Sequence, residues 1–483
     1  MSSLDLRMGT VKGRWVIAAA VLGSGVAFLD GTVVNAALPA IARDLHANLG
    51  DLQWVLTGYL LTLGSLLVLG GSLGDRYGRR RIFVIGLASF ASTSLLCAMV
   101  PDTGMLIAAR CVQGVAAALV VPNSLAIVSA SFVPDDRGRA IGAWSGLGGI
   151  ATAIGPFLGG WLIDSVSWRW VFVINLPISA VAIAIAMRHV PESRDEHAGA
   201  RLDVTGSALL TIGLAGLVYA LIEGPGNNWS VAALAFGGIG ILCLVAFLAV
   251  EARRENPMVP LSIFRSQQFS GANAVTFAVY AALGTVTFLL VVHLQTDLGY
   301  SALEAGAALL PITVCMLLLS ARAGALAQRI GPRLPMTVGP LVVAVGMVLL
   351  GQVAPGTTYW ETVFPALMVL GLGLALTVAP LTATVLGAVD DSHAGIASAI
   401  NNSVARIAGL LAVAVLPAAA GLTAGQGLDL VAGFSRAMYI AAALAAVGGV
   451  LAFLTIRQAA LVESVPRGNP AIPCYDSGVR VAG

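Results

Sequence analysis

The stretch GGSLGDRYGRRR, residues 70–81, lies between two long apolar runs, at 52–69 and 82–100. Apolar runs of about 20 residues are long enough to cross a bilayer as helices. Arginines, by contrast, concentrate in short loops on the cytoplasmic side of a membrane. The stretch therefore predicts a tight cytoplasmic turn between two transmembrane helices. Its charged side chains are Asp75, Arg76, Arg79, Arg80 and Arg81.

The composition of the whole chain agrees with a membrane protein. Of 483 residues, 58% are hydrophobic and only 10% are charged, whereas a soluble domain carries about 25% charged residues. A globular core cannot hide so much apolar surface, so we expect an all-α integral membrane protein surrounded by the lipid bilayer. The net charge of +2 is nearly neutral, and the basic residues are spread over short loops. No nucleic-acid partner is therefore expected.

Apolar runs long enough to span the bilayer recur along the chain, and we predict fourteen transmembrane helices. Their expected ranges are 15–40, 52–73, 82–100, 104–132, 140–163, 170–187, 204–222, 231–250, 269–296, 303–327, 334–354, 361–388, 394–422 and 434–456.

The distribution of basic residues predicts the orientation. Most of the 26 Lys and Arg residues fall in connecting segments on the side of the N-terminus. By the positive-inside rule that side is cytoplasmic. An even number of spans brings the C-terminus to the same side, so we expect a multi-pass protein of the inner (cytoplasmic) membrane with both termini in the cytoplasm. The five cysteines lack metal-ligand spacing and are expected to be packing residues.

Two short patterns occur twice in the chain at nearly the same offset. GSLGDRYGRR at 71–80 resembles GALAQRIGPR at 324–333, and DDRGRAIGAW at 135–144 resembles DDSHAGIASA at 390–399. Internal repeats of this kind occur in many transporters. They predict two six-helix bundles with two further helices inserted between them. The expected division is an N-terminal bundle at 1–190, a linker with the inserted helices at 191–265, a C-terminal bundle at 266–457 and a cytoplasmic tail at 458–483.

Five motifs in this order resemble the major facilitator superfamily, in its fourteen-helix drug/proton antiporter branch. The resemblance implies a multidrug efflux transporter that exports amphiphilic compounds in exchange for protons by alternating access. The chain shows no metal-ligand set or nucleophile triad, so no enzyme activity, cofactor or metal is expected, and we expect a monomer. The motifs are LDGTVVNAALPAI (29–41), GSLGDRYGRR (71–80), LIAARCVQG (106–114), GIATAIGPFLGG (149–160) and LGYSALEAGAALLP (298–311).

The resemblance assigns a gating role to the turn at 71–80. Glycines permit a tight backbone approach there, and Asp75 can cap a helix and pair with neighbouring arginines. The alternative interpretation is that the charges of this turn only set the orientation of the chain in the membrane and have no role in gating. In the second copy of the motif Gln328 replaces the aspartate. We therefore expect the second turn to hold the bundles together on the cytoplasmic side more weakly than the first. The gating residues are Gly71, Asp75, Arg76, Gly78, Arg79 and Arg80.

The motif in the fifth span is implied to be an antiporter element at the interface of the bundles. Proline removes a backbone donor and clashes one turn back, which weakens the helix. Small residues four positions apart let helices approach closely. A packing kink without a transport role is the alternative. The residues are Gly155, Pro156, Gly159 and Gly160.

Asp30 is the only carboxylate deep within a predicted span. At 1.5 Å per residue it lies about 22 Å from the cytoplasmic start of the first span, and Arg110 lies at about 21 Å. Ionisable residues within a bilayer are costly and usually functional. We therefore predict that Asp30 and Arg110 form a proton-coupling site, where burial favours the neutral carboxyl group and the arginine favours the charged one. A static buried ion pair is the alternative.

Further polar residues in the spans are candidates for a substrate cavity. Arg406 has no evident acidic partner in the second half of the chain, so it meets either an anionic or zwitterionic group of the substrate or backbone carbonyls. The candidates are Tyr59, Gln113, His293, Asn401, Asn402 and Arg406.

Three other functions remain as alternatives. The first is a dedicated exporter of one endogenous metabolite, such as an antibiotic or a lipid. The second is an importer, which the antiporter motif disfavours. The third is a membrane enzyme, which would gather several acids or histidines at one depth. The chain carries no P-loop, so ATP is not expected to drive it.

Overall fold

The computed structural model describes residues 6–194, 203–254, 257, 259–389, 394–422 and 431–458. Apart from its first residue, the predicted tail at 458–483 lies outside the described residues. So do most of the linker that precedes the inserted helices and the start of the repeated pattern at 390–399.

Helices make up nearly all of the described chain, and short turns connect them. The first nine are α1 (Val11–Leu45), α2 (Leu49–Tyr77), α3 (Arg79–Met99), α4 (Thr103–Ser131), α5 (Pro134–Ser165), α6 (Trp170–Val173), α7 (Asn175–His189), α8 (Val204–Gly226) and α9 (Val231–Arg253). After the short helix η1 (Leu261–Arg265) follow α10 (Gln267–Thr296), α11 (Ala302–Ala308), α12 (Leu310–Ile330), α13 (Arg333–Leu350), η2 (Tyr359–Val363), α14 (Phe364–Gly387), α15 (Ala394–Ala419) and α16 (Val431–Thr455).

Within the described residues, fourteen helical segments are long and apolar enough to cross a membrane. This confirms the predicted number of spans. Two of the fourteen are interrupted: α6 and α7 together form the sixth span, and α11 and α12 together form the tenth.

Prolines explain both interruptions. Pro177 follows the break at Ile174, and Pro311 follows the break at Leu309. A proline has no amide hydrogen and its ring clashes with the carbonyl four residues earlier, so the preceding turn cannot continue regularly. In the sixth span the break positions Asn175 at the start of α7.

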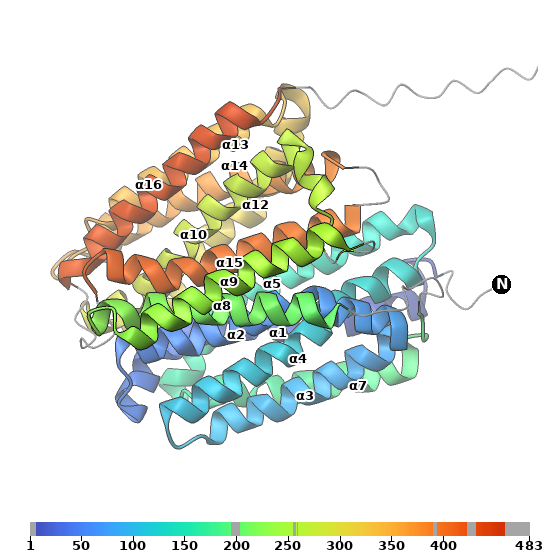
Figure 1. The fold of residues 1–483 in the computed structure, drawn as a ribbon, viewed down its shortest axis with the longest axis horizontal. Coiled ribbons are helices and arrows are strands. Elements are labelled where there is room, and N and C mark those ends of the chain that lie inside the picture. The colour runs from blue at the N-terminus through green and yellow to red at the C-terminus, as the bar shows by residue number, and fades with distance from the viewer. Residues whose placement is uncertain are drawn as a thin grey trace, which may run out of the picture.

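The spans gather into two groups (Figure 1). Helices α1–α5 and α7 pack together, and so do α10 and α12–α16. The hairpin of α8 and α9 lies against α2 and α15, one helix from each group. We call the two groups the N-terminal and the C-terminal bundle. Apolar side chains fill both, as expected for helices in a bilayer.

The two bundles meet mainly toward one end of the molecule. We call the end with residues 70–81 the arginine-rich end, and the opposite end, where α5 stops and α11 begins, the far end. At the far end the Asp164 carboxylate accepts hydrogen bonds from the backbone amides of Ala302 and Leu303, at 3.2 and 2.8 Å. Negative charge at a helix N-terminus is favourable, so Asp164 on α5 stabilises the start of α11.

Two glutamines add hydrogen bonds between the bundles. Gln53 on α2 donates to the Val413 carbonyl on α15 at 2.5 Å, and Gln295 on α10 donates to the Ala36 carbonyl on α1 at 3.0 Å. Both glutamines are buried. Because all these contacts lie toward the far end, that end is closed in this conformation.

Candidate functional site

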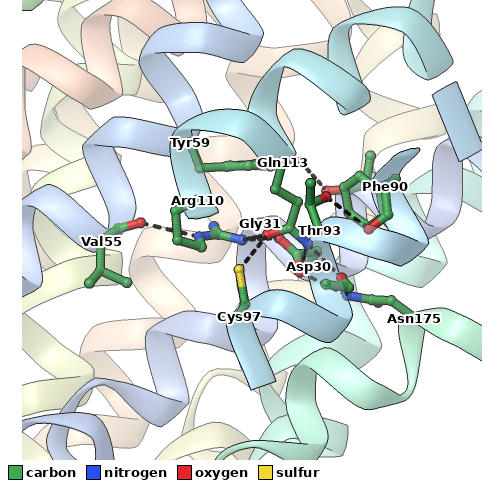
Figure 2. A network of polar contacts seen from close by, with 12 residues as sticks. Asp30, Gly31, Val55, Tyr59, Phe90, Thr93, Cys97, Arg110, Gln113 and Asn175 are labelled. Carbon is green, nitrogen blue, oxygen red and sulfur yellow. Dashed lines mark hydrogen bonds and ion pairs between the residues drawn. The ribbon is translucent and has the colours of Figure 1, made fainter. Parts of the chain in front are cut away.

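Asp30 on α1 and Arg110 on α4 form an ion pair at the centre of the N-terminal bundle (Figure 2). Both side chains are fully enclosed, with 0% of either residue exposed. The depth estimate from the sequence puts the two at one level, and the structure brings them into direct contact. Breaking such a buried pair by removing one partner typically costs about 3–5 kcal/mol.

Two amide side chains fix the second oxygen of the Asp30 carboxylate. Gln113 on α4 and Asn175 on α7 both donate to its Oδ1 atom, at 3.1 and 2.8 Å. Both amides also donate to the hydroxyl oxygen of Ser94 on α3, at 2.6 and 3.0 Å. The arginine thus contacts one oxygen of the carboxylate, and two amide donors contact the other.

The environment of Arg110 is equally specific. Its Nε donates to the Val55 carbonyl at 3.2 Å, and Nη1 also donates to the side-chain oxygen of Gln113 at 2.7 Å. The guanidinium lies 4.2 Å from the ring centroid of Tyr59 on α2, in a cation–π contact. The Tyr59 hydroxyl donates to the Ala27 carbonyl at 3.0 Å, which holds the ring in place.

Sequence reasoning missed Ser94 and Asn175. Asn175 had a recognisable signal, since it is a polar residue two positions before a proline in an otherwise apolar span. Ser94 had none, because serines that bond to their own helix backbone are frequent in apolar spans.

A small cavity of about 90 Å³ lies between the bundles, next to Arg110 and Tyr59. Drug-sized ligands occupy pockets of about 300–1,000 Å³, so in this conformation the cavity is too small for such a compound and has room for only a few water molecules. Both bundles contribute to its wall: Gly31, Asn35, Leu56, Tyr59, Leu60 and Arg110 from one, and Gly284, Thr287, Phe288, Gly409 and Val413 from the other.

The glycines of α5 pack differently along the helix. A Cβ atom on Gly155 or Gly159 would overlap side chains of α1, and one on Gly160 would overlap the Ala302 carbonyl of α11. The helix continues through Pro156, whose carbonyl lies against Gly306 of α11. The motif thus places α5 in close backbone contact with α11 at the far end.

Toward the arginine-rich end, three glycines of the same helix face open space. A Cβ atom on Gly142, Gly146 or Gly149 would meet no atom within 4 Å. These three positions lie in the half of α5 nearer the arginine-rich end, although a Cβ atom on Gly148 in that half would meet the Phe28 ring of α1 at 3.1 Å.

The turn at 70–81 is tied to its own bundle. Asp75 pairs with Arg79 across the turn, with 2.7 Å between the closest atoms, and Glu192 accepts from the Arg80 amide at 3.0 Å. Gly78 has a φ of +107°, which favours glycine, and a Cβ atom there would also press on Glu192. Gly71 lies against Pro122 of α4, and Arg76 lies 5.4 Å from the Tyr77 ring centroid.

Of the six predicted cavity candidates, only Tyr59 lines this cavity, and Gln113 lies behind it, bonded to Asp30 and Arg110. His293 is buried near the far end, stacked on Phe434 with 4.0 Å between the ring centroids, and its Nδ1 lies 2.5 Å from the carboxylate of Asp297. Asn401 donates to Asn273 and Thr276 of α10.

Asn402 is exposed and donates to the Ser398 carbonyl of its own helix. Arg406 lies three residues before the cavity-lining Gly409 on the same face of α15. Within the described residues, no group of three His, Cys, Asp or Glu side chains is placed to hold a metal ion.

Comparison with known proteins gives one matching family. The model described as Major Facilitator Superfamily matches residues 20–413 and 276–475. The chain is 35% identical over 416 residues to the "Probable actinorhodin transporter" of Streptomyces coelicolor, covering 83% of this chain and 72% of that protein. It is 34% identical over 418 residues to the "Tetracenomycin C resistance and export protein" of Streptomyces glaucescens, covering 84% and 76%.

A third relative is the "Multidrug resistance protein Stp" of Mycobacterium tuberculosis, 35% identical over 403 residues, covering 82% of this chain and 73% of that protein. Two solved structures share the fold. The peptide transporter POT has a TM-score of 0.67 and 13% sequence identity, and the match covers 94% of this chain and 96% of that one. The nucleoside transporter NupG has a TM-score of 0.65 and 11% sequence identity, and the match covers 92% of this chain and 100% of that one.

Proposed function

Because this chain belongs to the Major Facilitator Superfamily, we propose that it exports amphiphilic drugs or other small hydrophobic compounds across the cytoplasmic membrane in exchange for protons. The chain is a membrane transporter and not an enzyme. The names of its relatives, which include antibiotic resistance, export and multidrug resistance proteins, support drug export.

One observation supports the proposal of proton coupling. The Asp30–Arg110 pair is sealed within the N-terminal bundle, yet Arg110 also forms part of the wall of the cavity between the bundles. Water in that cavity gives protons a route to the edge of the ion pair. When Asp30 takes up a proton, Arg110 loses its counter-ion and interacts with whatever occupies the cavity instead.

Alternating access follows from the packing of the two ends. The arginine-rich end is cytoplasmic in this proposal, so the conformation described here is closed toward the outside. For release of substrate, the contacts of Asp164, Gln53 and Gln295 at the far end must separate. The turn at 70–81 then latches the bundles on the cytoplasmic side, as the gating motif implies. The protein works as a monomer.

A dedicated exporter of one metabolite is the second candidate. It is favoured by the relatives whose names mention a single antibiotic, such as actinorhodin or puromycin. The ion pair, the cavity and the proton coupling would be the same, and only the range of compounds would be narrower.

Transport by the purified full-length protein in proteoliposomes tests the proposal. Under an imposed pH gradient we expect uphill accumulation of puromycin and of ethidium, and a protonophore should abolish it. A sodium gradient of equal size should drive none. Accumulation that survives collapse of the pH gradient would contradict proton coupling, and accumulation of only one compound in a broad panel would favour the dedicated exporter.

A further inference from the structure

Arg406 is a half-buried cation without a counter-ion among the residues that the structure describes. It lies midway along α15, and its Nε atom is enclosed without a hydrogen-bond partner. Its side chain makes no ion pair or hydrogen bond with any residue that the structure describes. An unpaired charge in the interior of a membrane protein is costly and marks functional positions.

The arginine points across the boundary between the bundles. Its Cβ atom lies near Gly64 of α2, and its guanidinium lies 6.0 Å from the ring centroid of Phe28 on α1. Arg406 therefore belongs to the C-terminal bundle by sequence but contacts the N-terminal bundle. It is partly exposed, and so is Phe28, so neither is fully packed away.

A second donor without a partner adjoins the same aromatic ring. Trp144 on α5 packs edge-on against Phe28, with 6.2 Å between the ring centroids. The Nε1–H group of Trp144 is enclosed and donates to no described residue. Buried donors nearly always have partners in folded proteins. Two such donors beside one aromatic ring are therefore unusual, and neither has an acceptor among the described residues.

We propose that Phe28, Trp144 and Arg406 form a substrate subsite for an acidic group attached to an aromatic or conjugated ring system. The carboxylate or phenolate of the substrate pairs with Arg406, its ring packs on Phe28, and Trp144 donates to one of its oxygens. The subsite is next to the cavity, because Arg406 and the cavity-lining Gly409 share one face of α15.

This subsite deepens the proposed export function by naming a class of substrate, and it rests on that function for its purpose. Cations would be disfavoured beside Arg406, whereas anionic and zwitterionic compounds would gain from it. The subsite also differs from the proton site, because Arg110 already has its own carboxylate.

Binding of a matched pair of probes tests the subsite. We would use the full-length protein in nanodiscs of zwitterionic lipid, with anthracene-2-carboxylate and its neutral isostere anthracene-2-carboxamide, and subtract binding to empty nanodiscs. A charge-assisted pair should make the carboxylate bind about tenfold more tightly than the carboxamide. No pH gradient is present, so a failure of proton coupling would not affect this result.

Variants test whether Arg406 causes the preference for the carboxylate probe over the carboxamide probe. Arg406→Gln should reduce the preference to about twofold or less, and Arg406→Lys should keep part of it, because the charge remains but the planar fork is lost. Trp144→Phe should weaken the binding of both probes. Arg322→Gln on α12 removes an exposed arginine from another span and should leave the preference intact.

Three results would overturn the inference. They are equal affinity of the wild-type protein for the two probes, an unchanged preference in Arg406→Gln, and an equal loss of preference in Arg322→Gln. The first requires no variant, so it remains decisive even if Arg406→Gln does not fold.

Discussion

Arg110 and Arg406 are arginines within the spans of opposite bundles, and their surroundings differ: Arg110 is fully buried and Arg406 is half-buried. Arg110 has a carboxylate, a backbone carbonyl, an amide oxygen and an aromatic ring around it. Arg406 has an aromatic ring, and its Nε atom has no acceptor. The charge of Arg110 is thus balanced within its own bundle, whereas Arg406 has no ion-pair partner in the part of the chain that the structure describes.

The two repeated turns show the same asymmetry. Gly78 ends α2 and Gly331 ends α12, both with positive φ. The first turn contains the Asp75–Arg79 ion pair. In the second, Gln328 replaces the aspartate, and Arg333 lies 4.2 Å from the ring centroid of Phe453 instead. The backbone of the turn is repeated, and the ion pair is not.

The largest expected effect comes from the carboxylate of the N-terminal bundle. Asp30→Asn keeps the shape of the side chain but can neither carry nor release a proton, so we expect uphill transport in proteoliposomes to be abolished while substrate still binds. Asp297→Asn is the matched control, because Asp297 is also buried beside a basic group, His293, but in the C-terminal bundle.

If Asp297→Asn also abolishes uphill transport, the asymmetry between the bundles is wrong. If Asp30→Asn pumps at nearly the wild-type rate, the coupling site lies elsewhere. Membrane abundance of each variant must be measured first, because an unpaired Arg110 can cost about 3–5 kcal/mol of stability.

A smaller but still strong effect is expected from Gly160→Val on α5. Its side chain would overlap the Ala302 carbonyl, so the far end can no longer close. Spin labels at Asn48 and Gly356, in far-end loops of the two bundles, should lose their short-distance population. Gly146→Val makes the same change at a position of α5 where a Cβ atom meets no atom within 4 Å, and it should leave the distances as they are. An unchanged distance distribution in Gly160→Val would contradict the closure.

Asp75→Asn should lower transport several-fold with near-normal abundance. The Asp75–Arg79 pair is partly exposed, and exposed pairs contribute only about 0–1 kcal/mol to stability. The effect therefore reports on gating and not on folding. Gln328→Asn in the second turn serves as the control and should be neutral. Full transport by Asp75→Asn would reduce the turn to a topology signal.

The smallest effect concerns the charge of the substrate. With one deep carboxylate and an unpaired Arg406, we expect ethidium, a monocation, to be exported a few-fold faster than propidium, a dication with the same ring system. The ratio of initial rates in inverted vesicles measures this. Equal rates would weaken the view of the C-terminal bundle as a positively charged wall.

The sequence predicted the spans better than the directions of side chains. Spans depend on apolar length, which is local, so all fourteen could be found. Depth is also local, since 1.5 Å per residue brought Asp30 and Arg110 to one level. The direction in which a side chain points is not a local property, because a helix that is apolar on all sides does not indicate which of its faces meets which neighbour. The sequence therefore predicts His293 as a cavity residue, whereas its ring stacks on Phe434.

Asn175 illustrates the other limit. Its contact with Asp30 depends on the interruption of the sixth span at Ile174, which changes the direction of the side chain. A proline two residues later indicates an interruption, but not the direction that results. The two donors beside Phe28 could not be found either, because their lack of partners appears only when every neighbour has been placed.

The position of the α8–α9 hairpin has a consequence for how an amphiphile arrives. Leu214, Val218 and Ile222 of α8 pack against Leu61 of α2 and Leu410 of α15, and Thr211 donates to Ser65 at 2.9 Å. The hairpin thus covers the seam between the bundles on that flank. A compound dissolved in the lipid leaflet diffuses in two dimensions around the protein and meets a covered flank there. Lateral entry from the leaflet is left to the opposite flank, beside α5.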